Sequence, residues 1–197
     1  MNKDWVGGKK SVFSTLGASS HSEHDREQHD YYATEPKAAH LLMGVEKFST
    51  NIWEPACGEG HLAREFEKAG YIVKATDLID RGYGEGGVDF FYQDDIFNGD
   101  IVTNPPYKYA ADFVQKSLSL ILEGNKVAMF LKLTFLEGKE RKKFFKENNP
   151  TVVYVSSSRI QCALNGKFEA FKSSAAAYAW FVWIKGYKGD TIVKWIN

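Results

Sequence analysis

The sequence predicts an α/β fold in which a mostly parallel sheet is packed between helices. Two observations support this prediction. Short apolar or β-branched runs alternate along the chain with stretches of helical periodicity, which is the pattern of strands joined by crossover helices. The chain has 197 residues, of which 44% are hydrophobic, so a single domain can bury a substantial core.

Helices are expected in four places. Thr34 can cap a helix over 36–42, because Pro36 stands near the first helical position, where proline is favoured. Residues 61–69 repeat apolar side chains at helical spacing and end at Gly70, where a helix commonly places glycine. The two further helices are expected over 107–122 and 138–147.

Strands are expected where short runs of apolar and β-branched residues are bounded by polar residues or glycine. The last two strands are joined by the short segment 185–189, which predicts an antiparallel pair at one edge of the sheet. In chain order, the expected strands are 51–53, 71–76, 88–91, 100–103, 126–133, 151–156, 175–184 and 191–195.

The organisation of the chain predicts a flexible polar arm over 1–29 and a single domain over 30–197. Within the domain, 157–174 form a long polar loop, and long loops in compact domains are often functional. No apolar run approaches the roughly 20 residues of a membrane helix, and a signal peptide is not recognisable, so we expect a cytoplasmic protein without membrane contact. Cys57 and Cys162 lack zinc spacing, and no metal is expected.

The charges are segregated along the chain although the net charge is zero. Residues 1–107 contain 10 Lys and Arg against 18 Asp and Glu, whereas 108–197 contain 15 against 7. An acidic half suits a cationic ligand and a basic half suits a polyanion.

The segment Asn104-Pro105-Pro106-Tyr107, directly after the expected strand 100–103, is the most informative in the chain. The amide oxygen of Asn104 can accept a hydrogen bond from an amino group, and the carbonyl of Pro105, whose φ is fixed, is a second acceptor. Pro106 adds rigidity, and the ring of Tyr107 can stack on a flat ligand. A simple strand-ending turn would use similar residues. Two acceptors and a stacking face nevertheless suit a site that grips the amino group of a planar molecule.

A second constellation, 54–60, reads Glu-Pro-Ala-Cys-Gly-Glu-Gly and links an expected strand to an expected helix. This arrangement brings backbone close to a ligand at the carboxyl edge of a parallel sheet. It lacks the third glycine of a dinucleotide fingerprint and the lysine of a Walker loop. Glu54 and Glu59 would repel a pyrophosphate and favour a cation, and Asp77, at the end of the next strand, can accept both hydroxyls of a ribose. A cationic ligand with a ribose and no phosphate describes S-adenosylmethionine.

Together with Tyr-Tyr-Ala-Thr-Glu-Pro at 31–36, these motifs resemble the class I methyltransferases that methylate amino groups. The resemblance is greatest to the DNA N6-adenine methyltransferases of phages and prophages, and it extends from about Asp30 to Ile184. It implies a Rossmann-like three-layer sandwich with a seven-stranded, mostly parallel sheet and an antiparallel edge. It also implies S-adenosylmethionine as the cofactor and DNA as the partner, with RNA as the alternative.

The resemblance assigns cofactor-binding roles by matched position. The acid that reads the adenine amino group of the cofactor would be Asp89, with Asp94 and Asp95 as rivals. The other implied cofactor residues are Glu54, Ala56, Gly58 and Gly60 at the methionine end, Thr34 and Pro36 closing over it, and Asp77 at the ribose.

The resemblance also assigns residues to the target. Asn104 and Pro105 would hold the target amine, with Pro106 completing the catalytic segment, and Tyr107 would stack on the target base. Target recognition has three candidates in the sequence, which are the loop 157–174, the segment 134–143 and the N-terminal arm. The expected nucleic-acid contacts are Lys108, Lys139, Arg141, Arg159, Gln161 and Asn165.

The expected activity is methyl transfer to the exocyclic N6 of adenine in DNA, after the base has been flipped out of the duplex. Methylation of adenine N6 in RNA, of cytosine N4 in DNA or of glutamine N5 in protein would use the same grip. A protein of another class, a nucleic-acid binder without catalytic activity, would have little need of Asn104, Pro105 and Tyr107.

Overall fold

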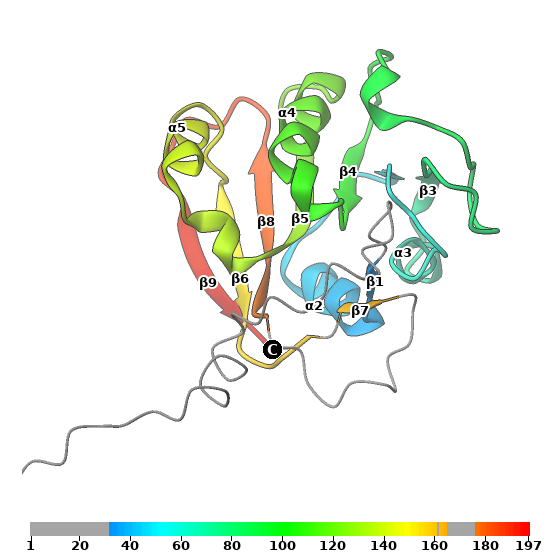
Figure 1. Ribbon diagram of the computed structural model, residues 1–197, viewed down its shortest axis with the longest axis horizontal. Coiled ribbons are helices and arrows are strands. Elements are labelled where there is room, and N and C mark those ends of the chain that lie inside the picture. The colour runs from blue at the N-terminus through cyan, green and yellow to red at the C-terminus, as the bar shows by residue number, and fades with distance from the viewer. Residues whose placement is uncertain (1–31, 161, 165–175) are drawn as a thin grey trace, which may run out of the picture. The chain divides into compact units, whose positions relative to one another are not determined.

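The computed structural model describes residues 32–160, 162–164 and 176–197, all within the unit Tyr31–Asn197 (Figure 1). The predicted arm over 1–29, residues 165–174 of the predicted loop, and the predicted contacts Gln161 and Asn165 lie outside the described residues.

Seven strands form one mixed sheet in the order β3-β2-β4-β5-β8-β6-β9 (Figure 1). Six strands run in the same direction, and β8 runs against its neighbours β5 and β6. This sheet confirms the predicted fold class. Its strands are β2 (Asn51–Glu54), β3 (Ile72–Ala75), β4 (Asp100–Thr103), β5 (Lys126–Lys132), β6 (Val152–Ser156), β8 (Tyr178–Ile184) and β9 (Ile192–Ile196).

Helices cover both faces of the sheet because neighbouring strand residues point to opposite sides. On one face, Ile52 and Trp180 pack with residues of α2 (Pro36–Val45) and α3 (Ala63–Lys68). On the other face, Trp53 and Phe181 pack with residues of α4 (Ala110–Leu120), and the two phenylalanines of α5 (Lys139–Glu147) join them. The result is the three-layer arrangement that the sequence predicts.

A small second sheet pairs β1 (Tyr32–Thr34) with β7 (Cys162–Leu164), antiparallel, with Thr34 opposite Cys162. The sequence did not predict either strand. Thr34 therefore does not cap α2. Glu35 stands at the N-cap without a side-chain hydrogen bond, while Pro36 begins the helix as expected.

The expected strand over 88–91 is not formed. Instead, Asp89 accepts a hydrogen bond from the backbone N–H of Phe91 and closes a turn that continues as the 3-10 helix η1 (Phe90–Tyr92). Phe90 is buried because its ring packs 5.3 Å from that of Trp53 and 5.0 Å from that of Phe113. The apolar run thus reflects packing onto α4 and not strand pairing.

The two closing strands also differ from the prediction, because they do not pair with each other. β8 lies between β5 and β6, and β9 pairs in parallel with β6 at the edge. The first six residues of β8 are buried, which suits an interior strand. By contrast, Ile192, Val193 and Trp195 of β9 are exposed, as at the outer edge of a sheet.

Candidate active site

Three predicted segments meet at the carboxyl edge of the sheet. β2 pairs in parallel with β3 on one side and with β4 on the other, with Trp53 opposite both Lys74 and Ile101. The chain leaves these three strands at the same edge, where open α/β sheets bind ligands. The glycine-containing loop 54–60, the acid Asp77 and the segment 104–107 are therefore neighbours.

Asp77 holds the loop in place through backbone hydrogen bonds. One carboxylate oxygen accepts from the N–H of Gly58 at 2.8 Å, and the other accepts from the N–H of Ile79 at 2.9 Å. Gly58 has a φ of 55°, which glycine adopts without strain. Each carboxylate oxygen has a second lone pair, so Asp77 can still accept hydrogen bonds from a ligand.

Gly60 is approached by an aromatic ring that the sequence analysis missed. A Cβ at Gly60 would collide with the ring of Tyr83, which carries the guanidinium of Arg64 at 4.4 Å from its centroid. Tyr83 lies in a glycine-rich stretch without periodicity, so no sequence signal marked it. The space gained by the missing side chain of Gly60 is thus used by Tyr83, and contact between Gly60 and a cofactor remains a prediction.

Glu54 is a buried acid at the end of β2, with 3% of its surface exposed. Burial raises the pKa of its carboxyl well above the usual value, and the nearby charges of Asp77 and Glu67 raise it further, against the hydrogen bond from the backbone of Ala63. Its Oε2 has no hydrogen-bond partner among the described residues. A buried carboxyl of this kind favours the approach of a cation or a hydrogen-bond donor.

The cysteine of the loop is not arranged as a nucleophile. Burial raises the pKa of the Cys57 thiol to about 12, and the carboxyls of Glu54 and Asp77 add to this effect. A thiol that stays protonated is a poor nucleophile. Cys57 therefore serves as a small packing residue, while Ala56 beside it is half-buried.

The small sheet contacts two residues of the segment 104–107. The side-chain amide Nδ2 of Asn104 donates to Oγ1 of Thr34 at 2.9 Å. The hydroxyl of Tyr107 donates to Sγ of Cys162 at 3.4 Å. Thr34 and Cys162 are cross-strand partners, so one residue pair supports both the amide and the ring. The resemblance implied a cofactor contact for Thr34, and no functional role was predicted for Cys162.

The rest of the segment is rigid and densely packed. Pro105 is buried, and Pro106 precedes the 3-10 helix η2 (Tyr107–Tyr109), which is why α4 starts only at Ala110. The half-buried ring of Tyr107 lies 6.0 Å from that of Tyr178 and 5.0 Å from the ammonium of Lys132. Burial raises the pKa of the Tyr107 hydroxyl, so it remains a hydrogen-bond donor.

The three acids proposed for the cofactor adenine differ in their surroundings. Asp89 is half-buried beside the buried Phe90. Asp94 is directed to the outer side of α4, where it pairs with Lys116 at 3.0 Å, and its side chain is 91% exposed. Asp95 is exposed as well. The surroundings favour Asp89 over its two rivals.

The predicted nucleic-acid contacts within the described residues do not form one continuous surface. Three of them are exposed at separate places in the chain, namely Lys108 in η2, Lys139 in α5 and Arg159 in the segment after β6. Arg141 is half-buried, and its guanidinium lies 4.2 Å from the ring centroid of Phe135, which the sequence analysis did not single out.

Metal sites and membrane-spanning helices can be assessed for the described part of the chain. No group of three or more His, Cys, Asp or Glu within it is placed to hold a metal ion. Among its helices, none is long and apolar enough to cross a membrane.

The strand order and the two helical layers define the class I methyltransferase fold. No protein-family model matches the sequence, and no curated protein matches it either. Solved structures do match in fold. A predicted O-methyltransferase from Agrobacterium tumefaciens is 14% identical, with a TM-score of 0.56 over 80% of this chain and 85% of that one. A Listeria monocytogenes protein, assigned as a class I S-adenosylmethionine-dependent methyltransferase, is 14% identical, with a TM-score of 0.55. That match covers 93% of this chain and 70% of the Listeria chain.

Some neighbours are larger proteins of restriction–modification systems. A Vibrio vulnificus protein, assigned as the modification subunit of a type I restriction enzyme, is 12% identical, with a TM-score of 0.55. The match covers 84% of this chain and 46% of that one. At this level of identity the likeness establishes the fold, and this chain spans less than half of that neighbour.

The burial of Glu54 leads to a testable prediction for stability. Its folded-state pKa is raised, so the stability of the protein falls as pH rises from the ordinary carboxyl range towards the folded pKa. Glu54→Gln removes this loss and should stabilise the fold at neutral pH, with little gain near pH ~4, where the carboxyl is protonated in both states. Urea unfolding at both pH values measures the difference. The exposed Glu147→Gln is the control, and equal stability of Glu54→Gln and wild type at neutral pH would contradict the prediction.

Proposed function

We propose that this protein is an S-adenosylmethionine-dependent methyltransferase that methylates the exocyclic N6 of adenine in DNA. The single observation that supports it best is the position of Asn104. Its amide lies at the end of β4, is held by Thr34, and adjoins a loop flanked by acids. A rigid pair of acceptors next to a site for a cation suits amino-group methylation.

The residues around the loop fit the cofactor. The buried Glu54, with an oxygen that lacks a partner among the described residues, suits the cationic methionine end. Asp77 would accept from the ribose hydroxyls with its remaining lone pairs, and Asp89 would accept from the adenine amino group. Bound S-adenosylmethionine would supply an electrophilic methyl group attached to a sulfonium.

Asn104 and Pro105 would activate the target. The exocyclic nitrogen of adenine is a weak nucleophile, because its lone pair is delocalised into the ring. Oδ1 of Asn104 and the carbonyl of Pro105 accept hydrogen bonds from its two N–H groups, which favours a pyramidal nitrogen with a localised lone pair. The localised lone pair would be directed at the methyl group that bound S-adenosylmethionine supplies, and its transfer would leave the carbon–sulfur electron pair on sulfur. The two acceptors stabilise the positive charge on nitrogen until a proton leaves to water.

The remaining residues would hold the base and the strand. An adenine within a duplex cannot reach the site, so it is flipped out, and the ring of Tyr107 replaces part of the lost stacking. Lys108 and the basic C-terminal half would contact phosphates. The restriction–modification neighbours support DNA as the substrate.

The same two acceptors could bind the amino group of other substrates, which are adenine N6 in RNA, cytosine N4 in DNA and glutamine N5 in protein. Labelled cofactor offered with duplex DNA, single-stranded DNA, RNA and protein, followed by digestion, identifies the product. N6-methyladenine recovered from DNA supports the proposal. Label in another product would instead identify that molecule as the substrate. DNA binding without any methyl transfer would support a nucleic-acid binder without catalytic activity.

Asn104 provides the most direct test of catalysis. Asn104→Ala removes one of the two acceptors, so methyl transfer should fall at least 100-fold, roughly the loss seen when one preorganised donor or acceptor is removed from a catalytic site. Cofactor affinity, measured by calorimetry, should stay close to that of wild type. Turnover above a few per cent of wild type would refute the catalytic assignment.

Asp77 tests the cofactor site. Asp77→Ala removes the ribose acceptor and the anchor of Gly58, so the dissociation constant for S-adenosylmethionine should rise about tenfold or more. Asp190→Ala, which removes an exposed acid in the turn between β8 and β9, is the matched control. An unchanged dissociation constant for Asp77→Ala would exclude the ribose role.

Thr34 separates two roles, because the resemblance places it at the cofactor while the structure places it on Asn104. Thr34→Val keeps the shape but removes the acceptor for Nδ2, so the amide can rotate and present N–H groups to the target amine. We expect kcat to fall about tenfold or more with a nearly unchanged KM for the cofactor, and Thr34→Ser to restore activity. A raised KM for the cofactor with normal kcat would instead support a cofactor contact.

A further inference from the structure

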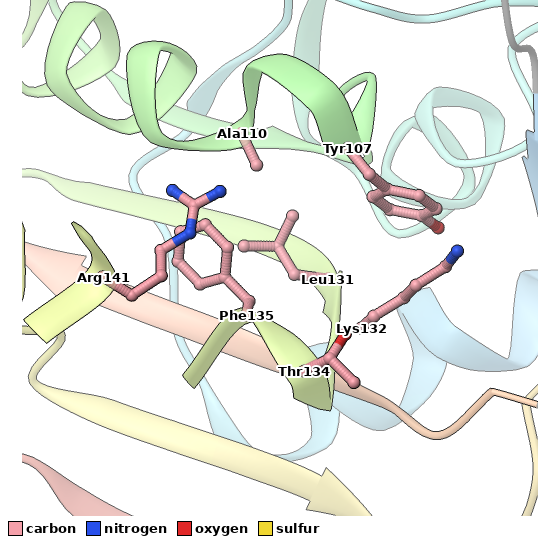
Figure 2. A pocket seen from close by; sticks show the side chains of 7 residues that line it. All are labelled: Tyr107, Ala110, Leu131, Lys132, Thr134, Phe135 and Arg141. Carbon is pink, nitrogen blue, oxygen red and sulfur yellow. The ribbon is translucent and has the colours of Figure 1, made fainter. Parts of the chain in front are cut away.

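A pocket opens beside Tyr107, on the side of the site away from the glycine loop. It has a volume of about 130 Å³ and lies between the start of α4, the end of β5, the 3-10 helix η3 (Leu133–Leu136) and α5 (Figure 2). Its lining includes neither Asn104 nor any residue of the loop 54–60. The pocket is thus adjacent to the proposed site of methyl transfer, with which it shares only the ring of Tyr107.

The pocket combines aromatic walls with two cations. Figure 2 shows the guanidinium of Arg141 over the ring of Phe135 at one end, and the ammonium of Lys132 near the ring of Tyr107 at the other. The side chain of Thr134 lies beside that of Lys132 and carries a hydroxyl that can donate a hydrogen bond (Figure 2). Leu131 and Ala110 supply the apolar surface between the two ends.

Neither cation has an anionic partner in the described part of the chain. Arg141 and Lys132 form no ion pair or hydrogen bond with another described side chain. Burial lowers the pKa of the Arg141 guanidinium, and the charge of Asp112 opposes this without reaching ion-pair distance. A half-buried guanidinium that lacks an anion retains all five donors for a ligand.

The size and chemistry of the pocket define its ligand. A cavity of about 150 Å³ accommodates one six-membered ring, so this pocket can take a phosphate group with part of a sugar but not a stacked pair of bases. Guanidinium, ammonium and threonine hydroxyl groups are the side chains that commonly bind nucleic-acid phosphates. An anion also complements the positive charge of the lining, which a neutral base edge would not.

We propose that this pocket binds a backbone phosphate of the substrate strand next to the target nucleotide. The proposal rests on the proposed function, because it takes Tyr107 as the residue that stacks on the target. A phosphate held in this pocket, with Arg141 at one end and Lys132 at the other, anchors the strand at the point where the base leaves the duplex. It contributes affinity without sequence preference, because phosphates carry no base information.

The salt dependence of DNA binding tests the proposal without cofactor or turnover. Arg141→Gln and Lys132→Gln should each weaken binding of a fluorescent duplex several-fold. Each should also lower the slope of log affinity against log salt by about 0.9 if a phosphate contact is lost. Lys188→Gln is the matched control, since Lys188 is exposed in the turn after β8, at the opposite edge of the sheet. Slopes equal to that of Lys188→Gln would overturn the proposal.

Neutral linkages identify the phosphate itself. Methylphosphonates are placed one at a time around the target adenine, and binding is measured with wild type and with Arg141→Gln. At the linkage held by the pocket, the neutral group should weaken wild-type binding and have little further effect on Arg141→Gln. Full additivity at every linkage, or a changed preference among base sequences, would overturn the proposal. Should Arg141→Gln fail to fold, Lys132→Gln serves in the same test.

The two proposals fail in different ways. Binding measured in the absence of cofactor does not depend on methyl transfer. Lowered salt slopes for Arg141→Gln and Lys132→Gln, with no methylated product, would refute the transferase and retain the phosphate pocket. Methylated DNA with unchanged salt slopes would retain the transferase and refute the phosphate pocket.

Discussion

The parallel pairing of β2 with β4 is the constraint on which the rest of the site depends. It brings Glu54 and Asn104 to the same edge although fifty residues separate them in the chain. A one-residue shift of register in either strand would turn all of its side chains to the other face and separate the acid-flanked loop from the acceptor segment. The buried tryptophan of β2 fixes this strand against other parts of the site, because Trp53 packs with Phe90 of η1 and its indole N–H donates to Thr76, which follows β3.

The small sheet adds the orientation that β4 alone cannot supply. The pairing of β4 fixes the backbone position of Asn104, but it does not fix the orientation of the side-chain amide. Thr34 accepts from Nδ2 and thereby directs Oδ1 away from β1, while its cross-strand partner Cys162 accepts from the hydroxyl of Tyr107. Acceptor and stacking ring are thus held by one pair of strands, so a displacement of this sheet would disturb both together.

The sequence was sufficient for the elements whose signals are local. The apolar runs predicted β2, β4, β5 and β6, and the parallel sheet then brought 54–60, Asp77 and 104–107 together. It failed where long-range packing decides. The apolar run at 88–91 packs onto α4 instead of pairing, β8 inserts between β5 and β6, and β1 and β7 form only because two distant segments meet. Tyr83 and Phe135 were missed for the same reason, since their roles depend on tertiary contacts.

The strand order converts the charge segregation of the sequence into a separation in space. Glu54 ends β2 and Asp77 follows β3, whereas beyond β4 the end of β5 carries Lys132 and the helix α5 carries Arg141. The segment 104–107 follows β4, the strand between these two groups. The acidic side of Asn104 therefore favours a cation and the basic side favours a polyanion, since each side attracts the opposite charge and repels its own. Under the proposed function, the methyl donor and its target would meet at the end of β4, beside Asn104 and Pro105.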